Sequence, residues 1–485
     1  MISIVNIMSN QQTGAHLEKS FKESWVFAMA LGAAIGFGAY ILPFDWMTGG
    51  GLAGTLIGFL IGGSMIAVIA LSYGYIIPRI PVTGGSVAYA FSSLGKHHAF
   101  IAGWALTLGY GCIVALNASA VTLVFRVTLP DLFMRLPMYE VAGWTIYLPE
   151  VLIASGFIIL FAWLNTQGNV ITGRFQYFAV VAMLLSVAII TMWMIAYYVI
   201  ERPELAPAFP SEISPTAAIL GVVAFAPWAY VGFDSIPQLA GEFSFSPKKA
   251  LKLLMWGVIA ATAIYWAMMI STSIAVGPNH ATYEGSAWPP AEAISNVMGP
   301  FGLALMVIAV SMGVLTGLNG FLAASSRVLY IMGKSGLGPI HFAKLTEKHP
   351  APINAIVFVA AISLISPWFG RASLTWVVDM SSAGITIAYF YACYCAYQIA
   401  SGKAVRGVQH SGETSTVQAI FSLLGCILSV AFLCLLIIPG SPGALGKESW
   451  IALFIWIAMV VVFYFARLGK FKSVSETDIE KAVFQ

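Results

Sequence analysis

Asp234 is an acid inside a long apolar stretch, and its position is the strongest chemical signal in the sequence. The stretch is GVVAFAPWAYVGFDSIPQ (221–238), and it also contains Gly232 between Pro227 and Pro237. An ionised carboxylate near the middle of a bilayer costs at least about 2.5–3.5 kcal/mol, so such residues are usually functional. Burial favours the neutral carboxyl group, and Asp234 could therefore carry a proton. It could also cap freed N–H groups of a broken helix, or contact a cationic substrate directly.

A second apolar stretch, GAAIGFGAYILP (32–43), has the same kind of interruption. A glycine inside a helix costs roughly 0.5–1 kcal/mol relative to alanine, and a proline removes a backbone hydrogen bond. Irregular backbone at membrane depth is tolerated only where it is buried in protein or lines a cavity. A matched pair of interrupted spans points to a transporter binding site, although glycine and proline also serve as packing points or kinks in membrane helices.

The two breaks would offer complementary groups to a small zwitterion. Unwinding near 36–38 frees N–H groups at the start of an outer half-helix, and such an end can hold a carboxylate. The freed carbonyl groups of 33–35 can accept from an ammonium, and residues 229–232 offer the same groups. Because an α-amino acid carries a carboxylate and an ammonium on one carbon, the breaks suit it.

Membrane-spanning helices must position these residues. The chain has 485 residues, of which 59% are hydrophobic and only 9% are charged, whereas soluble proteins carry about 25% charged residues. This composition predicts an all-α polytopic membrane protein with twelve transmembrane helices. The apolar segments long enough to span are roughly 24–48, 52–77, 98–126, 146–164, 172–199, 215–239, 250–276, 299–332, 353–368, 373–400, 416–438 and 449–467.

The distribution of positive charge supports this layout. With both termini inside, 18 of the 23 Lys and Arg residues fall on the inner side, as the positive-inside rule requires. The five on the outer side are Arg126, Arg135, Arg202, Arg371 and Lys447. We therefore predict a multi-pass protein of the plasma (inner) membrane with both termini cytosolic.

The expected organisation is one transport core with short tails. The two broken spans are the first and the sixth, so they correspond if spans 1–5 and 6–10 are two repeats. The segments are an N-terminal tail (1–23), a ten-helix core (24–400, with repeats 24–199 and 215–400), helices 11 and 12 (401–467) and a C-terminal tail (468–485).

Five motifs resemble those of the amino acid–polyamine–organocation superfamily of permeases. IGFGAYILP (35–43) and PWAYVGFDS (227–235) are similar to the helix-1 and helix-6 signatures of that family. The segment IPVTGGSVAYAFSSLG (80–95) resembles the first cytoplasmic loop of that family. The segment AGEFSFSPKKA (240–250) resembles its acidic segment after helix 6, and SSRVLYIMGKSGLGP (325–339) resembles the end of its helix 8. The resemblance implies a leucine-transporter-like 5+5 inverted repeat with two extra C-terminal helices, and secondary transport of amino acids or related amines.

The resemblance also implies a set of substrate-binding residues at the breaks. These are Ile35, Gly36, Phe37 and Gly38 in the first span, and Ala229, Tyr230 and Gly232 in the sixth. The family places an aromatic ring at the position of Trp228 to cover the substrate, although this ring could instead be packing. We add Tyr110 in the third span as a further candidate.

The fifth span departs from the pattern of many amino acid permeases, which carry a lysine there in place of a sodium ion. Aligning TGRFQYFAVVAMLL (172–185) puts Met183 at that position. Either Asp234 carries a coupling proton, or a cation binds between first-span carbonyls and oxygens of Thr316 and Asn319, since such oxygens suit hard cations. Alternatively, Thr316 and Asn319 form interhelical hydrogen bonds.

Three other acids lie within or beside spans. We expect Asp45 near the outer mouth and Glu242 near the inner end, where water is close. We interpret both of them, and Asp379, mainly as structural or gating residues.

The function predicted is secondary-active transport of amino acids, as proton-coupled uptake of neutral amino acids. The alternatives are an amino acid or polyamine exchanger and a non-transporting sensor or subunit, and sodium is the alternative coupling ion. No cofactor, metal or nucleic acid is expected. An enzyme is disfavoured because the sequence lacks an inward-facing Ser/His, paired-Asp or HExxH constellation.

Overall fold

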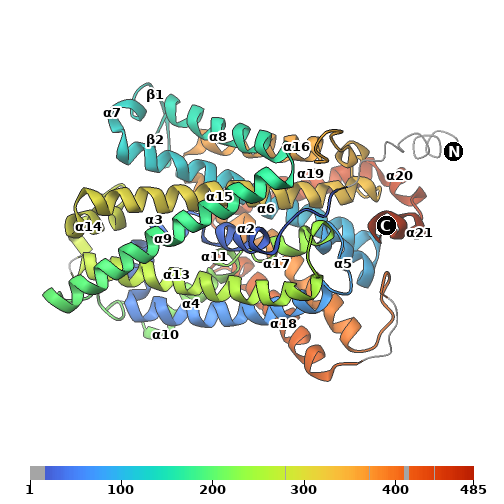
Figure 1. Cartoon of the computed structure of the whole chain (residues 1–485), viewed down its shortest axis with the longest axis horizontal. Coiled ribbons are helices and arrows are strands. Elements are labelled where there is room, and N and C mark those ends of the chain that lie inside the picture. Colours follow the sequence, from blue (N-terminus) through green and yellow to red (C-terminus); the bar gives the residue numbers. More distant parts are fainter. Residues whose placement is uncertain (1–16, 279, 371, 409–413, 442, 485) are drawn as a thin grey trace.

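The computed structural model describes residues 17–484 except 279, 371, 409–413 and 442. Most of the expected N-terminal tail, together with Arg371, lies outside the described residues. The helices form a bundle along one long axis (Figure 1). In Figure 1, the hairpin of β1 (Pro137–Val141) and β2 (Trp144–Tyr147) lies with α14 (Pro289–Met298) at one end of this axis, which we call the hairpin end. At the opposite end, the tail end, lie α5 (Gly85–Leu94) and the C-terminal helices.

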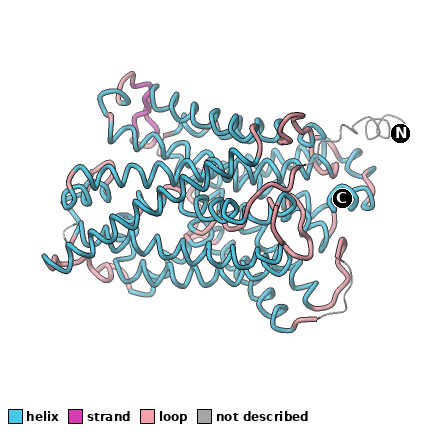
Figure 2. Tube along the Cα trace, viewed as in Figure 1, coloured by secondary structure: helices cyan, strands magenta, loops and turns pink. Residues whose placement is uncertain are grey.

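Eight helices in the described part of the chain are long and apolar enough to cross a membrane. They are α4 (Pro43–Ile76), α6 (Lys96–Thr128), α8 (Leu148–Thr166), α9 (Asn169–Glu201), α13 (Ala250–Val276), α15 (Pro300–Lys334), α18 (Thr416–Ile437) and α19 (Lys447–Ala466). The other expected spans fall on α17 (Ala372–Ala400) and on the shorter helices α2 (Glu23–Ile35), α10 (Pro215–Ala224) and α16 (Ile353–Ser363). Helix dominates the chain (Figure 2).

Both expected breaks are present in the backbone. The helix α2 ends at Ile35, and the chain restarts as α3 (Gly38–Ile41) after Gly36, which has φ 48° and ψ −136°. The sixth span is divided into α10, α11 (Ala226–Ala229) and α12 (Ser235–Gln238), with Gly232 at φ 132°. Side chains strain a backbone with such φ values, whereas glycine adopts it freely.

Small elements connect the long helices. The sequence analysis predicted no strand, but β1 (Pro137–Val141) and β2 (Trp144–Tyr147) pair antiparallel after α7 (Pro130–Phe133). The 3-10 turns are η1 (Ala240–Glu242), η2 (Pro247–Lys249), η3 (His280–Tyr283), η4 (Ile340–Ala343) and η5 (Ser366–Phe369).

The expected C-terminal tail is folded against the bundle as α20 (Leu468–Ser473) and α21 (Glu476–Phe484). Glu476 accepts from Arg406 at 2.8 Å, and Ile479 is fully buried. The Lys96 ammonium donates to the carbonyl oxygens of Phe471 and Val474, both at 3.2 Å. This segment therefore has a fixed place beside the start of α6.

Burial separates central from peripheral helices. In the most apolar 18 residues of α6, 89% are buried inside the bundle. In the most apolar 18 residues of α19, only 6% are buried. The core therefore surrounds α6, and α19 presents its apolar side chains outward, as expected for a helix that faces lipid. The site residues lie on the central helices.

Candidate functional site

The two breaks are in direct contact. A Cβ atom built on Gly232 would lie 2.4 Å from the backbone nitrogen of Ala34 and 2.9 Å from the carbonyl oxygen of Ala30. The unwound part of the sixth span therefore packs on the backbone of α2 where that helix approaches its end at Ile35. The fold thus brings together the two groups of residues that the sequence analysis assigned to one site.

Tyr265 of α13 ties the breaks to each other. Its hydroxyl lies 3.0 Å from the carbonyl oxygen of Ala34 and 2.7 Å from that of Ala229. Both carbonyls come from helix ends that have lost regular partners. The sequence analysis missed Tyr265, because a tyrosine in an apolar span carries no signal of which backbone it will reach.

Free N–H groups lie where the outer half of the first span begins. The N–H of Gly36 still donates to the carbonyl oxygen of Gly32, at 3.2 Å. Among the described residues, however, no hydrogen bond engages the N–H of Phe37. No side chain in the described part of the chain caps α3, and the first N–H groups of a helix have no intrahelical partner. This arrangement suits an anionic group.

Asp234 is fully buried and bonded within its own break. One carboxyl oxygen accepts from the N–H of Gly232 at 2.9 Å, and the other accepts from the hydroxyl of Tyr110 at 2.7 Å. The first contact engages an N–H group of the break, and the second joins two residues that were predicted separately. Among the other predicted residues, Ile35 and Ala229 are buried beside the breaks.

A cavity of about 420 Å³ opens at the hairpin end of the breaks, a volume typical of small-molecule sites. Phe37 and Trp228 line it, with their ring centroids 5.8 Å apart. Trp228 also packs on the first span, since a Cβ atom on Gly38 would lie 2.8 Å from its ring. Trp228 is thus both a wall of the cavity and a packing residue.

The acids Asp45 and Asp379 also line this cavity. Asp45 is exposed, in agreement with its expected place near a mouth of the molecule. The carboxylate of Asp379 accepts from the hydroxyl of Ser449 at 2.6 Å. The cavity therefore has apolar and aromatic walls with two carboxyl groups among them.

The side chain of Tyr230 belongs to the packing around the site. Its hydroxyl donates to the carbonyl oxygen of Phe59 at 2.8 Å and lies 2.8 Å from the hydroxyl of Thr262. It is thereby bonded to α4 and α13. The side chain of Tyr230 is therefore engaged in packing, and only its backbone is available to a ligand at the break.

Thr316 and Asn319 are fully buried in interhelical hydrogen bonds. The Thr316 hydroxyl donates to Gly313 at 2.8 Å and contacts the Gly32 carbonyl at 3.2 Å. The Asn319 amide donates to Gln176 of α9 at 2.7 Å and accepts from Asn165 of α8 at 3.1 Å. These contacts match the hydrogen-bonding alternative for the two residues. Met183 is fully buried on α9.

A buried ion pair lies near the tail end. Arg327 donates to both carboxyl oxygens of Glu242, at 3.1 and 3.0 Å, and to the side-chain oxygen of Asn169 at 2.8 Å. Glu242 is 0% exposed and Arg327 2%. The expectation that Glu242 lies close to water is therefore wrong, because Arg327 of α15, Asn169 of α9 and the N-terminal segment contact it and it is fully buried.

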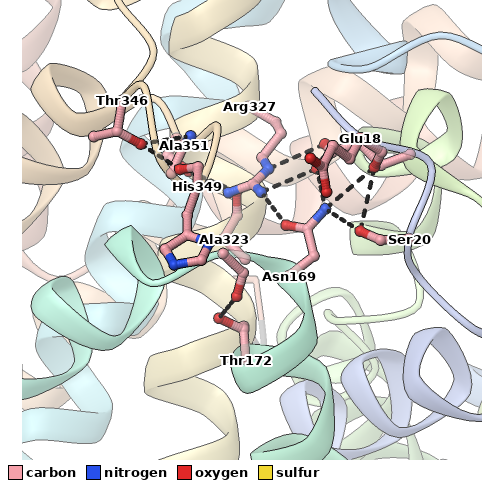
Figure 3. Close-up of polar contacts among 12 residues, drawn as sticks. Glu18, Ser20, Asn169, Thr172, Ala323, Arg327, Thr346, His349 and Ala351 are labelled. Carbon is pink, nitrogen blue, oxygen red and sulfur yellow. Dashed lines mark hydrogen bonds and ion pairs between the residues drawn. The ribbon is translucent and has the colours of Figure 1, made fainter. Parts of the chain in front are cut away.

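This ion pair also fixes the segment before α2. Figure 3 shows the Asn169 amide between Arg327 and the residues Glu18 and Ser20; it donates to the Ser20 hydroxyl at 3.1 Å. Phe21 donates its N–H to the Glu242 carbonyl at 3.1 Å. The start of the first span is thus held to the segment that follows the sixth.

The sequence analysis identified the segments that contain Glu242 and Arg327, but it did not predict that the two residues form an ion pair. Glu242 and Arg327 each lie in a motif that resembles the permease superfamily, 240–250 and 325–339. Nothing in a single sequence states that these two motifs meet. The signal was an arginine at the end of a long apolar helix, which requires a partner when it is buried.

We expect Tyr265→Phe to lower the free energy of unfolding by about 1–3 kcal/mol, because the buried carbonyl oxygens of Ala34 and Ala229 lose the hydroxyl proton that lies between them. Reversible unfolding in mixed micelles measures the change. The matched control is Tyr40→Phe, since the Tyr40 hydroxyl is buried with no partner among the described residues. Equal losses in the two variants would contradict the proposed role of the Tyr265 hydroxyl.

Comparison with known proteins places the chain among permeases. A family model described as amino acid permease matches residues 22–463. The amino-acid permease RocC of Bacillus subtilis (strain 168) is 23% identical, covering 96% of this chain and 97% of its own. A methylthioribose transporter of the same organism is 24% identical, with coverages of 94% and 95%. The lysine-specific permease LysP of Lactococcus lactis subsp. cremoris (strain MG1363) is 23% identical, with coverages of 97% and 93%.

These relationships confirm the resemblance found in the motifs, and with the apolar helices they indicate a multi-pass membrane protein. The matched region contains both breaks, the cavity and the buried ion pair. With its sequence matched over nearly its whole length, this chain belongs to the amino acid permease family.

Proposed function

We propose that this permease is a secondary-active transporter that binds an amino acid between the two helix breaks. The contact of Gly232 with the α2 backbone carries the proposal. It supports the proposal because the unwound part of the sixth span lies against the last turn of α2, next to the free N–H groups before α3. The predicted residues Ile35, Gly36, Phe37, Gly38, Ala229, Tyr230 and Gly232 supply its backbone, Trp228 covers it, and Tyr110 supports it through Asp234.

The substrate that we propose is a neutral amino acid with a small or apolar side chain. The aromatic rings of Phe37 and Trp228 and the side chain of Leu123 line the cavity on the hairpin side, and such walls favour apolar groups. A cationic amino acid or amine is the second candidate, because Asp45 and Asp379 lie in the same walls.

For the topology we propose twelve spans, with repeats at 24–199 and 215–400, helices 11 and 12 at 401–467 and cytosolic tails at 1–23 and 468–485. The hairpin end would then face outward. Support comes from the excess of Lys and Arg in the inner loops and from the pairing of the first and sixth spans. A broken helix in each repeat is a recurring feature of transporter sites.

For the coupling we propose that Asp234 carries a proton. It is fully buried, and its carboxyl group links Gly232 to Tyr110, so its charge state would alter the geometry of the break. Sodium bound near Thr316 and Asn319 is the alternative. Exchange without a coupling ion is a further alternative, which the transport assay distinguishes.

Reconstitution into proteoliposomes tests the proposed function. We expect radiolabelled neutral amino acids to accumulate when the lumen is more alkaline than the bath. A sodium gradient or a trapped counter-substrate replaces the pH gradient in parallel samples. Failure of all three conditions to drive flux of any amino acid or amine would overturn the proposal and favour a sensor or subunit.

Asp234→Asn tests the coupling. We expect this variant to lose the dependence of uptake on the pH gradient while it retains exchange, because asparagine keeps an acceptor for Gly232 but cannot carry the proton. Asp45→Asn is the matched control at an exposed acid of the cavity. A pH dependence that survives in Asp234→Asn would rule out the proton-carrying role.

A further inference from the structure

Asn117 of α6 presents a buried acceptor to the break of the first span. The residue is 1% exposed. Its amide nitrogen donates to the Ile113 carbonyl one turn earlier, at 2.9 Å. Its Oδ1 atom is buried and has no hydrogen-bond partner among the described residues.

The free Oδ1 atom lies at the glycine of the break. A Cβ atom built on Gly36 would be 3.3 Å from Oδ1. The adjacent helix α15 leaves room for the amide, since a Cβ atom on Gly317 would lie 2.6 Å from the Asn117 amide nitrogen. Gly313 of the same helix is in close contact with the break itself, since a Cβ atom on Gly313 would lie 2.1 Å from the carbonyl oxygen of Gly36. Gly36 and Gly317 thus leave room for the Asn117 side chain at the break, and Gly313 allows α15 to approach the backbone of the break.

A buried acceptor without a donor is destabilising, and a ligand that supplies the donor gains that energy on binding. The contact with Ile113 fixes the orientation of the Asn117 amide, because turning it would place the Oδ1 atom, an acceptor, against the Ile113 carbonyl oxygen, another acceptor. A carboxylate brings only acceptors, so it cannot satisfy Oδ1. An ammonium brings only donors, and its hydrogen bonds are charge-assisted.

We infer that Asn117 Oδ1 accepts a hydrogen bond from the α-ammonium group of the bound amino acid. This inference rests on the proposed function. It divides the zwitterion between two helices: N–H groups before α3 hold the carboxylate, and Asn117 on α6 helps to hold the ammonium. The carboxyl oxygens of Asp234 already accept from Gly232 and Tyr110, whereas the Oδ1 atom of Asn117 has no partner among the described residues. Asn117 is therefore a residue that discriminates amino acids from acids that lack the amino group.

The test is the ratio of the affinities for an amino acid and for its desamino analogue. The pairs are L-leucine with 4-methylpentanoate, and L-lysine with 6-aminohexanoate, measured by calorimetry on the full chain in detergent. We expect Asn117→Leu to lower the ratio by about 10- to 100-fold, the loss of a hydrogen bond to a charged group. The affinity for the analogue should stay nearly constant.

Asn165→Leu is the matched control, because Asn165 is also buried and also donates to a carbonyl one turn earlier, at 2.9 Å. It lies in the interhelical network with Asn319, so its loss should leave the ratio unchanged. Asn117→Asp keeps an acceptor and should retain or raise the ratio, which keeps the inference testable if Asn117→Leu does not fold.

The outcomes separate the inference from the proposed function. If the wild-type protein binds an amino acid and Asn117→Leu keeps the wild-type ratio, the inference is wrong and the proposed function stands. A lower ratio in Asn117→Asp would also overturn the inference. If the wild-type protein binds neither member of either pair, the proposed substrate class fails, and the inference fails with it.

Discussion

Replacing Arg327 by methionine will lower the free energy of unfolding by about 3–5 kcal/mol, because the Glu242 carboxylate then stays buried without its partner. Arg327 is 2% exposed and donates to both carboxyl oxygens of Glu242. It also donates to Asn169, which holds the segment before α2. The loss therefore affects one ion pair and the hydrogen bonds built on it.

Unfolding in mixed micelles measures this effect, and two further variants identify its cause. The double variant Glu242→Gln with Arg327→Met should recover part of the loss, since it removes the unpaired charge. Lys249→Met is the matched control, because Lys249 and Glu23 form an ion pair at 2.5 Å with side chains 53% and 34% exposed. An exposed pair contributes about 0–1 kcal/mol. Equal losses in Arg327→Met and Lys249→Met would contradict the buried-pair argument.

Gly232→Ala will reduce the initial rate of transport by at least about 100-fold. This reduction corresponds to an increase of at least ~2.7 kcal/mol in the activation free energy of transport. The added Cβ atom would lie 2.4 Å from the Ala34 nitrogen and 2.9 Å from the Ala30 oxygen. These atoms belong to a backbone and cannot turn aside as a flexible side chain could. The value of φ, 132°, adds strain for any residue other than glycine. Either α2 moves away or the break rearranges, and each change alters the proposed site.

Uptake into proteoliposomes, normalised to the amount of folded protein, measures the effect of this substitution. Gly257→Ala is the matched control, because Gly257 lies inside α13 and no atom of the residues that the structure describes lies within 4 Å of its added Cβ atom. Alanine in a helix interior should be neutral or stabilising by up to about 1 kcal/mol. Wild-type transport by Gly232→Ala would contradict the close contact of the two breaks.

The sequence by itself determined the class of fold and the places where helices break. Spans are recognised from local composition, because about twenty apolar residues in a row have few other uses. The breaks at Gly36 and Gly232 were equally local, since glycine and proline set the backbone of their own positions. The motif order indicated the family, which the match over 22–463 confirms.

Only the tertiary structure decided which side chains meet. Tyr265 reaches two carbonyls from distant parts of the chain, Tyr110 reaches Asp234, and Arg327 covers Glu242, which the sequence analysis had placed near water. Among the described residues, the Oδ1 atom of Asn117 has no partner, and this follows only from the side chains and backbone that surround it. In a membrane protein the buried and the lipid-facing sides of a helix are both apolar. Hydrophobic patterning therefore reveals that a span exists but not which of its faces packs inward, and long-range polar contacts follow from that packing.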